Sequence, residues 1–135
     1  MKPTTPSALA AAGATAAALA LALTPAGAVA ARGAGVTASP NPVSASAVVT
    51  ISGRGWPVIE FCERRVRLTL ESAQNAVTIG TVAVGERGGF RRRWRPSRSN
   101  AGPGRWRVVA RMRCESGDDG SPVPVVRRVA LRIVS

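Results

Sequence analysis

Arginine supplies almost all of the positive charge in this 135-residue chain, and it is densest in the segment GGFRRRWRPSR, residues 88–98. A guanidinium group binds phosphate, sulfate or carboxylate through paired hydrogen bonds, so clustered arginines are candidates for anion binding. A second arginine-rich segment, GRWRVVARMRC, covers residues 104–114. The candidate anion-binding residues of the two segments are Arg91, Arg93, Arg95, Arg105, Arg107, Arg111 and Arg113.

Two interpretations of these arginines remain open. If the two segments are neighbouring strands of one sheet, up to seven arginines share a face, and such crowding is costly unless an anion relieves it. Alternatively, arginine is only the polar half of each alternating strand, screened by salt. Arg92 alternates onto the inner side in either case, so we expect it at an edge or with its charged head reaching water.

The overall charge favours an anionic partner. The net charge is +12, and it becomes +11 without Lys2, the single lysine. We expect either an anionic polymer or a protein as partner. Sequence-specific nucleic-acid binding is not expected, because the chain shows no helix for a groove and no recognised nucleic-acid module.

Residues that could perform catalysis are scarce. The chain contains no histidine, so its serines and cysteines lack the usual base and zinc lacks its usual nitrogen ligand. The clustered acids are expected to pair with nearby arginines or to be solvated. Those acids are Glu60, Glu63, Asp118 and Asp119. We therefore expect no catalytic residue, metal or cofactor, and a protein that acts by binding.

The first thirty residues have the three-part layout of a secretory signal. Lys2 precedes an uncharged run from Ser7 to Leu23, and the segment ends in a small-x-small pattern, Ala28–Ala30. The run falls short of the roughly 20 strongly apolar residues of a membrane span, which disfavours an uncleaved anchor. We expect a signal peptide over residues 1–30, a single domain over 31–135, and a secreted or cell-envelope protein without a transmembrane segment after cleavage.

Two cysteines, Cys62 and Cys114, remain in the predicted exported domain. An even number of cysteines in an exported chain indicates a disulfide. This one closes a loop of about fifty residues, for which the chain-entropy estimate is about 4 kcal/mol.

Alternating hydrophobicity predicts about seven strands and no helix in the exported domain. We expect strands at residues 36–39, 46–52, 65–71, 77–84, 90–96, 105–114 and 123–134. In the last strand Arg127 falls on the apolar side, so we expect a bulge near Arg127 or Arg128. The aromatic side chains predicted to pack in the core are Phe90, Trp94, Trp106 and, beside Cys62, Trp56.

About a hundred residues with this many short strands are typical of an antiparallel immunoglobulin-like β-sandwich. A small closed barrel is the alternative, but the alternation implies two inner faces and the strand number is odd. We expect the domain to be a monomer.

Two segments resemble secreted bacterial immunoglobulin-like domains. They are VTASPNPVSASAVVTISGRGW, residues 36–56, and the pattern G-x-F…W-x-P…G-P-G-x-W-x-V-x-A-x-x-x-C, residues 88–114. The run VVTISGRG, residues 48–55, is also similar to the opening of enediyne-binding apoproteins of the neocarzinostatin type. The resemblance implies the fold and an exported setting, and it implies no reaction.

These observations lead to an expected function. We expect a secreted, non-catalytic domain whose basic sheet face contacts anionic polymers of the cell envelope or the extracellular medium. Two alternatives remain open: a small-molecule carrier of the chromoprotein-apoprotein type, and a purely structural or protein-docking domain.

Overall fold

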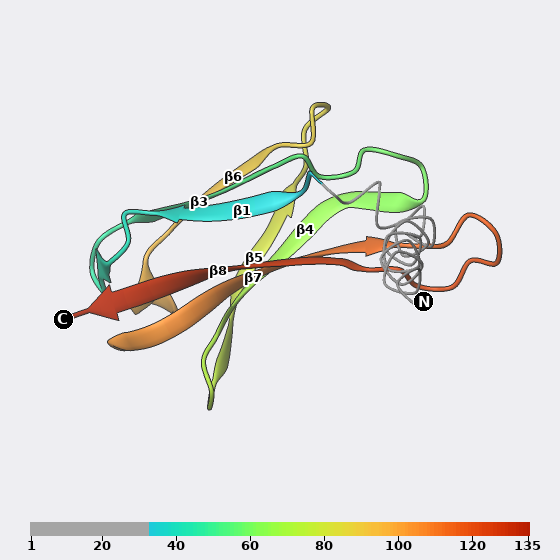
Figure 1. The fold of residues 1–135 in the computed structure, drawn as a ribbon. Helices are drawn as coiled ribbons and strands as arrows, with labels where there is room; N and C mark the ends of the chain where they lie inside the picture. The colour runs from blue at the N-terminus through green and yellow to red at the C-terminus, as the bar shows by residue number, and fades with distance from the viewer. Residues whose placement is uncertain (1–32) are drawn as a thin grey trace, which may run out of the picture. The chain divides into compact units, whose positions relative to one another are not determined.

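The computed structural model describes residues 33–135, so the predicted signal peptide over residues 1–30 lies outside the described residues (Figure 1). The described part is all-β, and its one short helical element is a 3-10 turn. The elements are β1 (Gly35–Ser39), β2 (Val43–Ser44), β3 (Val49–Arg54), β4 (Cys62–Glu71), β5 (Ala76–Ala83), β6 (Phe90–Trp94), η1 (Pro96–Ser99), β7 (Gly104–Cys114) and β8 (Val125–Val134).

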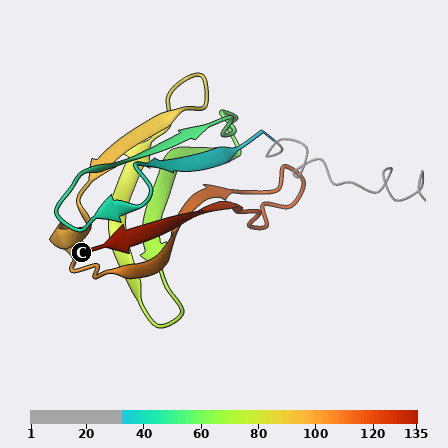
Figure 2. The same cartoon turned by 60° about the vertical axis from the view of Figure 1, so that its left-hand side comes forward.

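The strands form two separate sheets, which lie as two layers in Figures 1 and 2. A three-stranded sheet has the order β1-β3-β6, and a five-stranded sheet has the order β2-β8-β7-β4-β5. Every pairing is antiparallel except that of β2 with β8, which is parallel. The expectation of an antiparallel fold therefore holds for every pairing except that of β2, which was not expected because two residues are too few to show a period.

One hydrophobic core fills the space between the sheets. Ile51 of the three-stranded sheet and Leu68, Val108 and Met112 of the five-stranded sheet are completely buried. Each comes from the apolar side of an alternating strand, and burying such a side chain contributes about 1.5–3 kcal/mol. The period-two pattern thus supplies both inner faces.

The disulfide between Cys62 and Cys114 is confirmed, with an S–S distance of 2.06 Å. The two residues face each other on the neighbouring strands β4 and β7. Trp56 is buried near this end of the sheets, where its ring meets that of Phe90 edge-on at 5.8 Å. Its indole Nε1 donates a 2.9 Å hydrogen bond to the carbonyl oxygen of Gly35.

The boundaries of β3 differ from those expected. The strand begins at Val49 rather than Ser46, and it continues through Gly53 to Arg54. The Phe90 ring lies so close to Gly53 that a Cβ there would be 2.0 Å from a ring carbon. Gly53 therefore admits the aromatic ring instead of ending the strand.

The bulge expected near Arg127 or Arg128 does not form, because β7 and β8 pair in continuous register from Gly104↔Ile133 to Met112↔Val125. Arg127 stays on the inner side and sends its guanidinium to the edge of the sheet. Nε donates to the carbonyl oxygen of Ala34 at 3.0 Å, and Nη1 donates to that of Val126 at 2.8 Å. These carbonyls satisfy the inward-facing charge, which makes a bulge unnecessary.

A bulge does form in the pairing of β4 with β5, and the register of β4 with β7 also shifts between Cys62 and Val66. Leu68 faces Gly80 and Thr69 faces Thr78, so Ile79 is the extra residue. Ile79 turns into the core. Arg92, on the inner side of β6, places its guanidinium beside Gly80, where a Cβ would lie 2.9 Å from Nη2.

Candidate functional site

The seven candidate arginines do not share one face. Arg91 and Arg93 belong to β6, which lies in the three-stranded sheet, and Arg95 follows that strand. The other four belong to β7, in the five-stranded sheet. Because the two sheets pack against each other through their inner faces, their outer faces point in opposite directions. The single face of seven arginines considered from the sequence is therefore not formed.

The outer face of the five-stranded sheet is nevertheless strongly basic. Alternation along β4, β7 and β8 directs arginines from all three strands to this side, opposite the buried residues. This outer face, here called the β7 face, carries Arg65, Arg67, Arg105, Arg107, Arg111, Arg113, Arg128 and Arg132. Four of these eight were not among the sequence candidates, although the alternation of β4 and β8 places them on the same side.

Two pairs of arginines face each other directly on the β7 face. Arg105 is opposite Arg132, and Arg67 is opposite Arg111. Like charges directly opposite each other on neighbouring strands are destabilising. The face therefore holds closely spaced positive charges.

Glu71 provides the one ion pair formed within residues 33–135. Arg111 Nη1 lies 2.9 Å from Glu71 Oε2 and donates to Thr69 Oγ1 at 3.0 Å. The Thr69 hydroxyl donates in turn to Glu71 Oε2 at 2.9 Å. Hydrogen bonds from Arg111 and, second, from Thr69 lower the pKa of the Glu71 carboxyl below its ordinary value. Val109, apolar yet on the outer side, is buried with an exposed fraction of only 1% between Thr69 and Arg128.

The outer face of the three-stranded sheet is different in character. Small hydroxyl side chains from β1 and β3 lie beside the arginines of the edge strand β6. Thr37, Ser52 and Arg91 form one row across the sheet. None of the residues in β1, β3 and β6 is a carboxylate.

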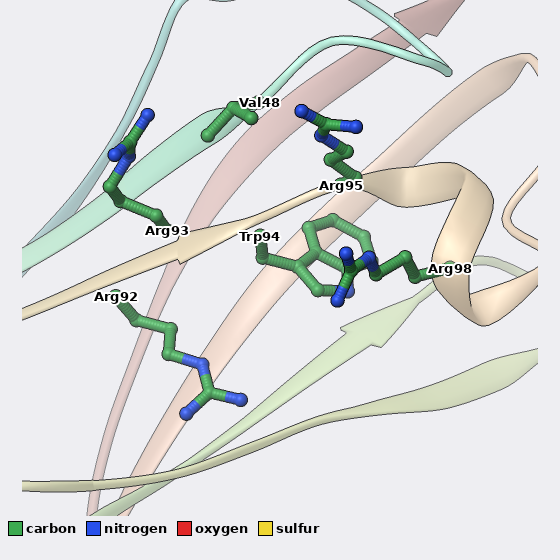
Figure 3. A pocket seen from close by; sticks show the side chains of 6 residues that line it. All are labelled: Val48, Arg92, Arg93, Trp94, Arg95 and Arg98. Carbon is green, nitrogen blue, oxygen red and sulfur yellow. The ribbon is translucent and has the colours of Figure 1, made fainter.

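Arginines line two hollows on the surface of the described residues. One of about 330 Å³ lies at β6 and η1, shown in Figure 3. Its lining residues are Val48, Arg92, Arg93, Trp94, Arg95 and Arg98. The other, of about 460 Å³, includes the facing pair Arg105 and Arg132 at one end of the β7 face. Arg92 and Arg98 were not among the sequence candidates. Alternation placed Arg92 on the inner side of its strand, and Arg98 fell in a predicted turn.

The acidic residues gather at the end of the domain that holds the disulfide. Phe61 and Glu115 are joined by a backbone hydrogen bond of 2.8 Å, which brings Glu60 and Glu63 to the same end. Within the described part of the chain these acids form no ion pair with arginine and are exposed, so of the two expectations, pairing or solvation, the structure has solvation. Five of the seven carboxylates lie here, namely Glu60, Glu63, Glu115, Asp118 and Asp119.

The tryptophans of the arginine-rich segments are anchored by hydrogen bonds. Trp94 is buried, and its Nε1 donates to Ser99 Oγ at 3.0 Å. Trp106 is half-buried, and its Nε1 donates to the carbonyl oxygen of Gly102 at 2.9 Å. Phe90 packs with Trp56 in the core.

In the described range, no three histidine, cysteine, aspartate or glutamate side chains are grouped so that they could hold a metal ion. No helix within residues 33–135 has the length and apolar character needed to cross a membrane. Comparisons with protein-family models, with curated proteins and with solved structures find no match to this chain.

Proposed function

We propose that this protein is a secreted, non-catalytic domain with an immunoglobulin-like fold that binds an anionic polymer of the cell envelope or the extracellular medium. The β7 face is the proposed contact surface. The secretory layout of residues 1–30 and the disulfide support an extracellular setting. Binding a repeating anion requires no catalytic group, and the chain contains no histidine.

The single observation that carries this proposal is the charge of the β7 face, where eight arginines share the surface with one ion-paired glutamate. Their spacing is set by a sheet whose strands lie about 4.8 Å apart, so a polymer with closely spaced phosphates or sulfates meets several guanidinium groups at once. Release of the polymer's counterions then drives binding, which makes the affinity strongly dependent on salt.

The experiment compares two triple variants with the same loss of charge. In the face variant, Arg107, Arg128 and Arg132 are changed to glutamine. In the control variant, Arg54, Arg87 and Arg91 are changed to glutamine. All six side chains are exposed, and none of the control residues lies on the β7 face. Binding to heparin, teichoic acid, duplex DNA and anionic vesicles is measured over a range of salt concentrations.

We expect the face variant to bind more weakly than the control variant. With duplex DNA, we compare the slope of the logarithm of the binding constant against the logarithm of the salt concentration. This slope should become shallower by about 1 for each phosphate-contacting arginine that the variant removes. Equal losses in the two variants would mean that net charge alone attracts the polymer. Absence of binding by the unchanged protein at physiological salt would overturn the proposal.

Protein docking is a second candidate, favoured by exposed apolar side chains at the disulfide end. Val58, Ile59, Phe61 and Val123 are each between 37% and 47% exposed. Because the acids surround this patch, a basic partner segment with apolar side chains fits it best. Changing Ile59 and Phe61 to serine should then abolish capture of a basic, apolar peptide and leave polymer binding unchanged.

The carrier alternative requires an apolar cleft at one end of the sheets. Arginines line both of the hollows described above. This chemistry favours an anionic ligand over an uncharged chromophore.

A further inference from the structure

We infer that the hollow at β6 and η1 is a separate binding site for a compact oligophosphate. It lies on the three-stranded sheet and its free edge, away from the β7 face, so it goes beyond the proposed polymer binding. Four of its six lining residues are arginines: Arg92, Arg93, Arg95 and Arg98. Carboxylates are absent from this lining.

The fold brings these arginines together from both sides of an edge strand. In Figure 3, Arg93 and Arg95 project from the same side of β6 as Val48, whereas Arg92 projects from the opposite side. Arg98 comes from η1 and, like Trp94, lines the hollow. Because β6 pairs only with β3, the guanidinium groups surround an edge of β6 that forms no ladder with another strand.

Hydrogen bonds hold the turn that carries Arg98. Ser97 N donates to the carbonyl oxygen of Ala45 at 2.8 Å, and Ala101 N donates to that of Pro96 at 3.1 Å. The Trp94 indole donates to Ser99 Oγ, which ties the turn to the end of β6. The backbone that carries Arg98 is therefore ordered before a ligand arrives, which lowers the entropic cost of binding.

The charge of this site is not neutralised within the domain. None of residues 33–135 forms an ion pair with Arg92, Arg93, Arg95 or Arg98, since the ion pair of this part of the chain joins Arg111 to Glu71 in the other sheet. Four neighbouring cations with no carboxylate repel one another, and an anion in the hollow relieves that repulsion. This distinguishes the cluster from Arg127, whose guanidinium bonds to backbone carbonyls.

The size and chemistry of the hollow favour an oligophosphate over other anions. A volume of about 330 Å³ lies at the lower end of the range for small-molecule pockets. Four guanidinium forks need several acceptor oxygens in that space, and linked phosphates supply them more densely than a carboxylate does. Trp94 is 7% exposed, so it offers little ring surface for stacking a nucleobase. We therefore expect the phosphate chain itself to be recognised.

Isothermal titration calorimetry of the purified protein with sodium tripolyphosphate tests this site by measuring the affinity. Citrate and orthophosphate are the comparison anions. The site variant carries Arg93→Gln and Arg98→Gln, and a control variant with the same charge carries Arg54→Gln and Arg91→Gln. All four side chains are exposed, so neither variant should lose its fold. The face variant with Arg107, Arg128 and Arg132 changed to glutamine is titrated as well.

We expect tripolyphosphate to bind at least about tenfold more tightly than citrate, since each charge-assisted hydrogen bond contributes about tenfold or more. The site variant should lose at least about tenfold in affinity, and the control and face variants should lose much less. The inference would be overturned if the site and control variants lost equal affinity for tripolyphosphate. It would also be overturned if the unchanged protein bound citrate as tightly as tripolyphosphate, or did not bind tripolyphosphate. If the face variant loses polymer binding but still binds tripolyphosphate, the site at β6 and η1 is separate from the proposed polymer-binding surface.

Discussion

Arg127 links the two sheets, because its Nε donates a 3.0 Å hydrogen bond from β8 to the carbonyl oxygen of Ala34, just before β1. Arg92 lies where β6 of one sheet contacts β5 of the other, and its guanidinium lies beside Gly80. The edges of the two sheets come together in two places, β1 with β8 and β6 with β5. One inward-facing arginine lies at each place. Inward-facing charge at an edge is a known protection against pairing with strands of another molecule. Arg127, which bonds to the backbone of the other sheet, has a structural role that the exposed arginines lack.

Changing Arg127 to glutamine should destabilise the domain by about 1–3 kcal/mol, because the carbonyl oxygen of Ala34 loses a charged donor. The adjacent Arg128→Gln change removes the same charge from an exposed side chain and should alter stability by less than about 0.5 kcal/mol. Urea unfolding of both variants measures the difference. Similar stability in the two variants would mean that Arg127 does not join the sheets.

Changing Gly80 to alanine should destabilise the domain by more than about 1 kcal/mol. Gly80 has a φ of +149°, which L-residues rarely adopt, and a Cβ there would displace the Arg92 guanidinium. Gly35→Ala is the control, since a Cβ at Gly35 meets nothing within 4 Å and its φ is not positive. Thermal unfolding should show a lower midpoint for the first variant alone. An unchanged midpoint would contradict the strain assigned to this bulge.

Changing Cys62 and Cys114 together to serine should lower the free energy of unfolding by about 4 kcal/mol, the chain-entropy estimate for a separation of 52 residues. Reduction of the unchanged protein should produce the same loss, because both treatments free the same loop. Urea unfolding with and without a reductant makes the comparison. A reduced protein as stable as the oxidised one would show that the disulfide contributes little.

Acidification should weaken the contact between Glu71 and Arg111. Hydrogen bonds from Arg111 and then Thr69 lower the pKa of Glu71 in the folded state, so its stabilisation is present above the ordinary pKa of 4.5. It is lost as the pH falls through the folded-state pKa. For an exposed pair the effect is about 0.5 kcal/mol.

The Glu71→Gln variant tests this expectation. The difference in unfolding free energy between the unchanged protein and the variant should be largest at neutral pH and should shrink below about pH 4.5. Stability is measured by urea unfolding at several pH values. A difference that stays constant with pH would show that the carboxylate charge has no part in the contact.

The strands were predictable from the sequence because their period-two pattern is local. The prediction for residues 105–114 and the observed β7 differ by one residue, and the apolar side of this strand faces the core. The disulfide followed from having only two cysteines. β2 was missed because two residues show no period, and the bulge was placed in β8 because backbone carbonyls near Arg127 were not visible in the sequence.

The sequence by itself determined which side of each strand is polar, since alternating side chains point to opposite faces of any sheet. Only the tertiary structure decided which arginines are neighbours. The connection from β5 to β6 crosses between the sheets, which separates Arg91 and Arg93 from the arginines of β7. The pairing of β8 with β7 adds Arg128 and Arg132 to the β7 face. The turn η1 places Arg98 at the hollow beside β6. Strand partnership depends on contacts between distant segments, so no local pattern of residues specifies it.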